Sequence, residues 1–216
     1  MINQPNEFFE RLRQRLSFPL PGSAAHDLAR AVPDAVARKR FNHDAPPKTG
    51  GVLILLQSSL ESFSFPLILR PDYDGAHSGQ VSFPGGKAEE HEEPAAAAIR
   101  ETMEEIGVPS EQIQLLGGLT PFHVIPSNFI VHPFVGLLPG PIPFNPDPRE
   151  VKQILTMNLN ELIHDQALGI TEINASGFML KAPFFTAEKQ IVWGATAMIL
   201  SEFRQIVKEV LNIQKN

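Results

Sequence analysis

The spacing of hydrophobic residues predicts helices near both ends of this chain. Residues 6–16 repeat their apolar side chains with helical periodicity, through Phe8, Phe9, Leu12 and Leu16. Residues 24–40 also have a helical pattern, which Pro33 interrupts because proline lacks a backbone N–H. The pattern of residues 195–211 predicts a last amphipathic helix.

Segments rich in Val, Ile, Leu and Phe predict β-strands in the middle of the chain. The strongest are residues 52–57 and 65–70. Further strands are expected at 80–83, 112–119, 129–137, 151–157 and 177–185, with a proline-rich loop at 139–148. Strands and helices are mixed without strict alternation, so the pattern predicts an α+β fold or a layered α/β/α sandwich.

A break rich in Pro and Gly at residues 46–51 indicates where the chain divides. We expect an N-terminal helical extension over residues 1–45 and one main domain over residues 46–216. The whole chain is long enough for one domain with a substantial core. It contains no internal repeat and no low-complexity tract.

The best-defined helix is predicted over residues 94–106. Proline at position 94 suits the first turn of a helix, and Gly107 can end it. On a helical projection one apolar stripe, which we expect to pack on the sheet, is formed by Ala95, Ile99, Met103 and Ile106. Three glutamates then lie together on the opposite side of the helix: Glu101, Glu104 and Glu105.

Adjacent glutamates repel one another unless a cation joins them, and carboxylate oxygens favour hard ions such as Mg²⁺, Mn²⁺ or Ca²⁺. Taken alone, the same spacing is also typical of a solvated acidic helix face. The residues before and after the glutamates decide between these interpretations.

Residues 86–108 resemble the Nudix box at each fixed position, namely Gly86, Glu92, Arg100, Glu101, Glu104, Glu105 and Gly107. Thr102 departs mildly, since the family usually has an aliphatic residue there. The resemblance implies a Nudix-type α/β/α sandwich with a mixed β-sheet, and hydrolysis of a nucleoside diphosphate linked to another group. It also implies a Mg²⁺ or Mn²⁺ cofactor, because divalent cations neutralise the diphosphate oxygens and orient the attacking water.

The resemblance also implies roles for single residues. The metal ligands would be Glu101, Glu104, Glu105 and the backbone carbonyl of Gly86. Glu101 or Glu105 is the preferred group to activate water. Arg100 would orient a glutamate and can pair with Glu104 at i, i+4. Glu92 would support the loop, or a metal through water.

Upstream of the box, Arg70, Gly79 and residues 83–86 resemble the signature of the coenzyme A diphosphatase subfamily. Pro71 and Gly75 depart from that signature, which has a serine and an arginine at these positions. If the resemblance extends to the substrate, the enzyme splits coenzyme A or acyl-CoA into 3′,5′-ADP and 4′-phosphopantetheine or its acyl derivative.

In that case the candidate substrate contacts are Arg70, Lys87 and His77. Ordinary roles stay open for each, because exposed cationic side chains are common and a loop histidine often makes only local hydrogen bonds. Trp193 could line a pocket for the base or pack in the core. Glu150, after the proline-rich loop, is either a general base from outside the box or a surface glutamate.

The composition restricts the partners. A formal charge of -6 argues against attraction of the whole molecule to nucleic acid or to an anionic membrane. A nucleotide-diphosphate substrate would therefore depend on local cations. The absence of cysteine excludes disulfides, zinc–thiolate sites and cysteine nucleophiles. A cytoplasmic location is the default expectation, because no secretory signal or bilayer-length apolar stretch is found. The oligomeric state is not fixed by the sequence, and a homodimer is an open option.

Two other functions stay open at this point. A Nudix enzyme acting on ADP-ribose or on a dinucleotide such as NADH has the same box, and the departures at Pro71 and Gly75 keep this alternative open. A nucleotide-binding sensor without catalysis is a hypothesis of another class. The three intact glutamates of the helix argue against it, since a binding protein has no obvious need for all of them.

Overall fold

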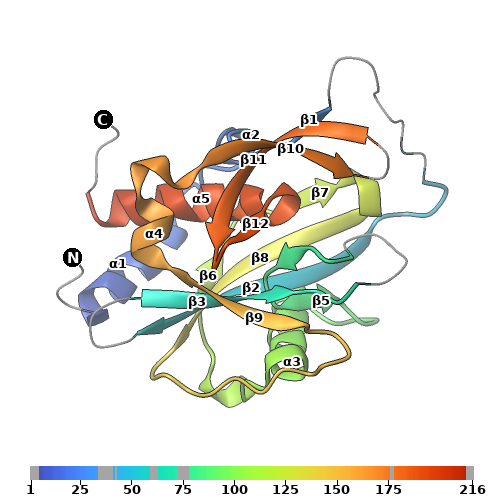
Figure 1. The fold of residues 1–216 in the computed structure, drawn as a ribbon. Coiled ribbons are helices and arrows are strands. Elements are labelled where there is room, and N and C mark those ends of the chain that lie inside the picture. The colour runs from blue at the N-terminus through green and yellow to red at the C-terminus, as the bar shows by residue number, and fades with distance from the viewer. Residues whose placement is uncertain are drawn as a thin grey trace.

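The computed structural model describes residues 5–33, 41, 43–58, 63–72, 78–175 and 178–212 (Figure 1). Its helices are α1 (Pro5–Leu16), α2 (Ser23–Asp27), α3 (Pro94–Ile106), α4 (Leu159–Ile163) and α5 (Gly194–Val210). Its strands are β1 (Val32–Pro33), β2 (Lys48–Ser58), β3 (Phe63–Leu69), β4 (Val81–Ser82), β5 (Gly85–Lys87), β6 (Gln114–Gly118), β7 (Phe122–Val124), β8 (Phe129–Leu138), β9 (Gln153–Asn158), β10 (Gly169–Ala175), β11 (Phe178–Ala187) and β12 (Gln190–Val192). Within these residues no helix combines the length and the apolar character that crossing a bilayer requires.

The central sheet has the strand order β4-β3-β2-β8-β6, with β5 beside β2, β7 beside β8 and β9 beside β3. Strands β2 and β8 run parallel over their length, whereas the other pairs are antiparallel, so the sheet is mixed. A smaller sheet contains β1, β11 and β10, with β12 paired to β11. Helix α3 covers one face of the central sheet and α5 lies on the other (Figure 1). The α+β class and the layered arrangement predicted from the sequence are confirmed.

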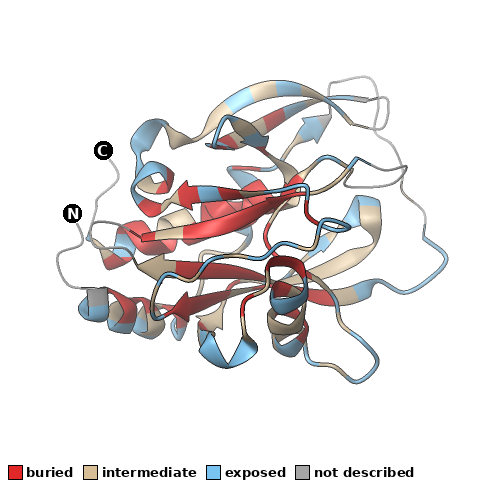
Figure 2. Ribbon diagram, turned by 60° about the horizontal axis from the view of Figure 1, so that its bottom comes forward, coloured by how far each residue is buried: buried red, intermediate tan, exposed pale blue. Residues whose placement is uncertain are grey.

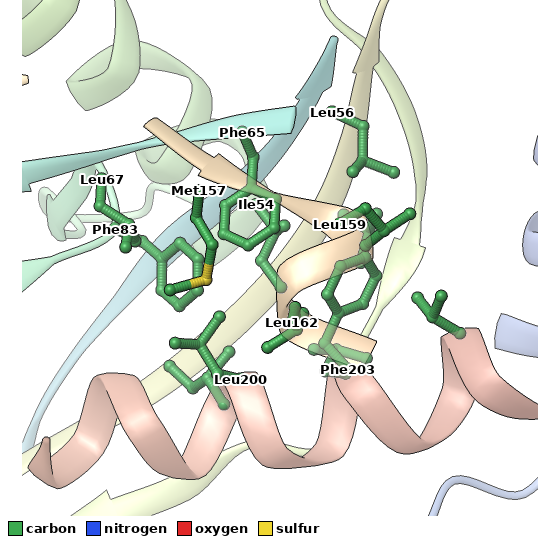
Figure 3. Packing of buried hydrophobic residues seen from close by; sticks show 14 of the residues in the cluster. Ile54, Leu56, Phe65, Leu67, Phe83, Met157, Leu159, Leu162, Leu200 and Phe203 are labelled. Carbon is green, nitrogen blue, oxygen red and sulfur yellow. The ribbon is translucent and has the colours of Figure 1, made fainter. Parts of the chain in front are cut away.

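The core is divided by the central sheet because strand residues alternate between its faces. Ile54 and Leu56 of β2 belong to the larger cluster, which contains the apolar face of α5. Leu53 and Leu55 point the other way and pack with α3. Figure 3 shows Phe203 of α5 among side chains of the sheet and of α4. The buried residues run through the central strands and α5, as Figure 2 shows.

Helix α1 packs into this larger cluster. Phe8 stacks on Phe63 of β3 with ring centroids 5.0 Å apart, and Phe9 meets the same ring edge-on at 4.9 Å. Leu12 is fully buried. The periodicity of residues 6–16 therefore identified both this helix and its buried side. The domain boundary expected between residues 45 and 46 stays a prediction.

Helix α2 is joined to α5 by a buried carboxylate. Glu202 of α5 accepts hydrogen bonds from the Gly22 N–H (2.9 Å), the Thr120 N–H (3.1 Å) and the Thr120 hydroxyl (2.6 Å), and its other partner is His26 Nε2 at 3.0 Å. Burial alone would raise the pKa of Glu202, but hydrogen bonds from His26, Thr120 and Gly22 lower it below its ordinary value. These contacts attach the segment before β2 to the core.

The helix predicted over residues 24–40 is confirmed over residues 24–27 and wrong over residues 28–33. Helix α2 ends at Asp27, and Val32–Pro33 form β1, which pairs with β11 through Val32 and Lys181. A proline lacks a backbone N–H and disfavours helical geometry in the residue before it, so the chain extends at this point. The rest of that prediction falls on residues 34–40 and lies outside the described residues.

Helix α3 has the predicted bounds but buries a different face. Its fully buried residues include Ala97, Ala98 and Glu105, whereas Met103 of the predicted stripe is 42% exposed. The buried face is turned by about 100°, one residue step, from the apolar stripe. The small side chains let the helix approach β2, where a Cβ on Gly51 would stand 2.9 Å from the Ala98 Cβ. Close backbone approach, rather than hydrophobicity, selects this face.

Candidate metal and diphosphate site

Three carboxylates converge beside α3. Glu101 and Glu105 come from the helix and Glu150 comes from the loop before β9, and one oxygen from each lies within 4.8 Å of the others. Glu105 is buried, Glu101 is partly exposed and Glu150 is exposed, so the group faces solvent on one side. Hard carboxylate oxygens at this spacing fit a divalent cation such as Mg²⁺ or Mn²⁺.

The loop that carries Glu150 is attached to the C-terminal end of α3. The Asn145 N–H bonds to the Ile106 carbonyl (2.9 Å), and the Asp147 N–H bonds to the Glu105 carbonyl (3.0 Å). The last carbonyls of a helix have no partner within the helix, and here the loop supplies one. A turn with hydrogen bonds from Glu150 and Val151 to the Asp147 carbonyl then leads into β9. The backbone thereby fixes the position of Glu150.

Glu105 is the most perturbed acid of the group. Its Oε2 accepts a 2.8 Å hydrogen bond from the Gly85 N–H, and its Oε1 lies 3.9 Å from Nη1 of Arg70. Burial raises the pKa of Glu105 to about 8. The Gly85 hydrogen bond and the charge of Arg70 act in the opposite direction, whereas the charges of Glu101 and Glu150 add to the increase. Without a metal, burial thus favours the neutral form of Glu105, and a divalent cation bound beside it would favour the ionised form.

Arg100 connects the acidic residues on the outer side of α3. Its Nε and Nη2 bond to the two oxygens of Glu92, each at 2.9 Å, and Nη1 reaches Glu101 at 3.0 Å and Glu104 at 3.1 Å. Nη2 also bonds to the Lys87 carbonyl at 3.1 Å. Hydrogen bonds from Arg100 and the Glu89 N–H lower the pKa of Glu92 to about 2. The expected i, i+4 ion pair with Glu104 is present, and Arg100 holds the Glu101 carboxylate in place.

Glu104 lies outside the converging group. Its side chain is 50% exposed, and its contact is with Arg100. Glu150, rather than Glu104, completes the trio with Glu101 and Glu105. Helix geometry explains the difference, because Glu101 and Glu105 are one turn apart on the buried side while Glu104 is rotated toward solvent. The role of Glu104 as a metal ligand stays a prediction.

Gly86 lies directly against Glu101. A Cβ on Gly86 would stand 2.5 Å from the Glu101 carboxylate carbon, so a side chain here would displace that carboxylate. Strand β5 pairs with β2 through Gly86 and Gly51, so the Gly86 backbone lies between β2 and the Glu101 side chain of α3. The Gly86 carbonyl oxygen lies beside Gly50 of β2, and a Cβ added to Gly50 would stand only 2.0 Å from that oxygen. Metal binding by this carbonyl stays a prediction.

The predicted substrate contacts are distributed differently. Arg70, at the end of β3, faces Glu105 and therefore borders the carboxylates. Lys87, at the end of β5, is exposed, and its carbonyl accepts a hydrogen bond from Arg100. His77 lies outside the described residues. Trp193 precedes α5 and is partly buried.

A family model for the NUDIX domain matches residues 48–176 of this chain. The chain belongs to the Nudix family. A Nudix hydrolase named NudL in Yersinia pestis is 32% identical over 176 residues, which are 81% of this chain and 87% of that protein. NudL of Photorhabdus laumondii is 32% identical over 134 residues, or 62% of this chain and 71% of the relative. Both relatives are described as uncharacterized.

The fold is shared with solved Nudix structures. The Nudix hydrolase RenU of M. smegmatis superposes with a TM-score of 0.50 at 16% identity, covering 78% of this chain and 89% of RenU. The family model and the NudL relatives make this protein a Nudix hydrolase, and the superposition shows that it has the Nudix fold. Nudix hydrolases generally use divalent metal ions, which agrees with the chemistry of the three carboxylates.

From sequence pattern alone, Glu150 is only a weak candidate. No fixed spacing links Glu150 to the box. Its one sequence signal is its position just before a predicted strand, where the proline-rich loop returns to the sheet. The Gly85 N–H was missed for another reason. A backbone donor to Glu105 has no side-chain signature, although two glycines before the box indicate a turn whose N–H groups are accessible.

Proposed function

We propose that this Nudix hydrolase cleaves the diphosphate bond of coenzyme A or acyl-CoA, giving 3′,5′-ADP and 4′-phosphopantetheine or its acyl derivative. One observation carries the proposal. The segment that resembles the coenzyme A diphosphatase signature contributes both Arg70 and the Gly85 N–H to Glu105, at the edge of the three carboxylates. A cationic group beside an acidic metal-binding group suits a diphosphate, whose oxygens need both kinds of contact.

In this proposal Glu101 and Glu105 would hold Mg²⁺ or Mn²⁺, with Glu104 and the Gly86 carbonyl as further predicted ligands, and Glu150 faces the same position. The bound cation would neutralise the diphosphate oxygens and lower the pKa of a coordinated water. Arg100 and Glu92 act as positioning residues, because their hydrogen bonds fix the Glu101 carboxylate. Arg70 donates to a phosphoryl oxygen, with Lys87 and His77 as predicted additional contacts.

Glu150 is the candidate for moving the proton of the attacking water. It is the exposed member of the trio, so it can be reached from solvent, and its backbone is fixed to α3 through the loop. Glu105 is less suited to this role, because it is buried and already accepts the Gly85 N–H. The assignment moves the base from the box glutamates Glu101 and Glu105, preferred from the sequence, to a residue outside the box.

The test is a substrate screen of the full-length protein with Mg²⁺ or Mn²⁺, in which products are identified by mass. The screen compares coenzyme A, an acyl-CoA, ADP-ribose and NADH. We expect 3′,5′-ADP and 4′-phosphopantetheine from coenzyme A, with no turnover in EDTA and recovery when the metal is restored. Faster turnover of ADP-ribose or NADH would overturn the coenzyme A assignment and leave a Nudix diphosphatase of another specificity.

The sensor hypothesis is tested with the same protein. Wild type that binds coenzyme A or ADP-ribose without any turnover, and a Glu105→Gln variant that binds them equally well, would exclude the proposed hydrolysis. Activity that persists after thorough chelation would instead refute the metal role of the carboxylates.

A further inference from the structure

Two buried polar side-chain atoms have no hydrogen-bond partner within the part of the chain that the structure describes. They are Nε of Arg70 and Oγ of Ser82. Buried donors and acceptors are almost always paired, because an unpaired one retains the cost of its desolvation. Two such atoms on neighbouring strands therefore require an explanation, and they carry complementary chemistry, since the guanidinium donates and the hydroxyl accepts.

Strand register places Arg70 and Ser82 on the same face of the sheet. Ser82 of β4 is opposite Ile68 of β3, and the Arg70 N–H bonds to the Gln80 carbonyl at 3.0 Å. Arg70 is two residues beyond Ile68, so its side chain leaves the strand on the same side. Ile68 packs in the cluster that contains residues of α3. Ser82 is thus the diagonal neighbour of Arg70, within reach of a long side chain.

The present partner of Arg70 is a weak one. Its Nη1 is 3.9 Å from Oε1 of Glu105, which is an ion pair but too long for a hydrogen bond. The Arg70 side chain is 30% exposed, so one edge of the guanidinium faces solvent beside the carboxylates. A cation bound by Glu105 would weaken this ion pair further and leave the guanidinium without a partner on the protein.

We propose that Ser82 is a positioning residue for Arg70. When substrate binds, the Arg70 guanidinium moves from Glu105 to the diphosphate, and the Ser82 hydroxyl accepts its Nε–H. This hydrogen bond leaves Nη1 and Nη2 free to donate to phosphoryl oxygens as a pair, a bidentate geometry that suits phosphate. Ser82 then acts on substrate binding only through Arg70. The inference rests on the proposed diphosphate hydrolysis but not on coenzyme A as the substrate.

The kinetic test compares Ser82→Ala, Arg70→Ala and the double variant with the best substrate of the screen. Ser82→Ala should raise KM about tenfold with kcat nearly unchanged, the factor expected for one hydrogen bond to a charged group. Ser82→Thr keeps the hydroxyl and should restore KM. In the Arg70→Ala background, Ser82→Ala should have no further effect, because the residues act as one unit.

Ser64→Ala is the matched control, since Ser64 is a partly buried serine on β3, six residues before Arg70. It should leave KM and kcat unchanged. Independent, multiplying effects of Ser82→Ala and Arg70→Ala would overturn the proposal. So would an unchanged KM in Ser82→Ala, or a kcat loss that follows a loss of thermal stability.

A second measurement does not need turnover. In ¹⁵N-labelled protein with Mg²⁺, methylene diphosphonate serves as a diphosphate that cannot be hydrolysed, and the Arg70 Nε–H resonance is assigned from its loss in Arg70→Ala. Binding of the probe should slow solvent exchange of this proton in wild type and not in Ser82→Ala. Exchange that slows equally in both refutes the role of Ser82. If the screen shows no turnover but this difference is present, the proposed function fails while the positioning role stands.

Discussion

The burial of Glu105 predicts that Glu105→Gln stabilises the metal-free protein although it inactivates the enzyme. In the folded protein the pKa of Glu105 is raised from 4.5 to about 8, and its side chain is 2% exposed. Glutamine has the shape of the protonated acid and can still accept the Gly85 hydrogen bond. The substitution therefore removes the need to protonate a buried acid on folding, and it removes a metal ligand at the same time.

The magnitude follows from linkage. A raised folded-state pKa contributes stability that is fully present below pH 4.5 and is lost as the pH rises to about 8. At about 1.4 kcal/mol per pKa unit, the wild-type loss is about 1 kcal/mol at pH 5, about 3 kcal/mol at pH 7 and about 4 kcal/mol at pH 8. The advantage of Glu105→Gln should grow by the same amounts.

The assay is urea unfolding of wild type and Glu105→Gln in EDTA at pH 5, 7 and 8. Added Mg²⁺ should then stabilise the wild type more than the variant, because only the wild type keeps the full set of carboxylates. The variant should also lose several orders of magnitude in rate. A variant that is less stable than wild type at pH 8 in EDTA, or a difference that does not change with pH, would refute this account of Glu105.

Three further substitutions test other parts of the molecule. Glu150→Gln should lower kcat about 100-fold or more, with little change in Tm because the residue is exposed. The control is Glu111→Gln, at an exposed glutamate in η1 (Ser110–Gln112), which should have no effect. Equal rates for both variants would remove Glu150 from the mechanism. Arg100→Lys should raise the Mg²⁺ concentration for half-maximal activity, because lysine lacks the planar fork with which Arg100 binds Glu92 and Glu101 together. An unchanged metal requirement would contradict the positioning role. Glu202→Gln should destabilise the fold by about 2 kcal/mol in urea unfolding near neutral pH. Because the pKa of Glu202 is lowered, the extra stability of the wild type should be present above the ordinary glutamate pKa and should disappear as the pH falls below that value. Extra stability that persists in acid would contradict the ionised network.

The elements predicted well from the sequence are those whose ends are marked by helix- or strand-terminating residues. Helix α3 begins at Pro94 and ends before Gly107, as predicted, because proline suits the first turn and glycine adopts the left-handed cap, here with φ 72°. Strand β8 was likewise found within one residue, since its apolar run continues between Asn128 and Pro139. Short strands such as β5 were missed, because a Gly-Gly-Lys segment has no strand periodicity of its own.

The site was only partly predictable, for a different reason. The box identified Glu101 and Glu105, but hydrophobic periodicity assigned the wrong buried face to α3, because Ala97 and Ala98 count as weakly apolar although they permit the closest packing. Helical projection placed Glu105 opposite the packed stripe, whereas its side chain is buried and burial favours its neutral form. Neither the position of Glu150 nor the pairing of Ser82 with β3 could be derived from local pattern, because both depend on long-range contacts.

The loop that carries Glu150 is held to α3 by main-chain hydrogen bonds from positions 145 and 147. Main-chain donors are supplied by every residue type except proline. Substitutions along this loop should therefore leave the glutamate at its end in place, whereas a change in the length of the connection should move it.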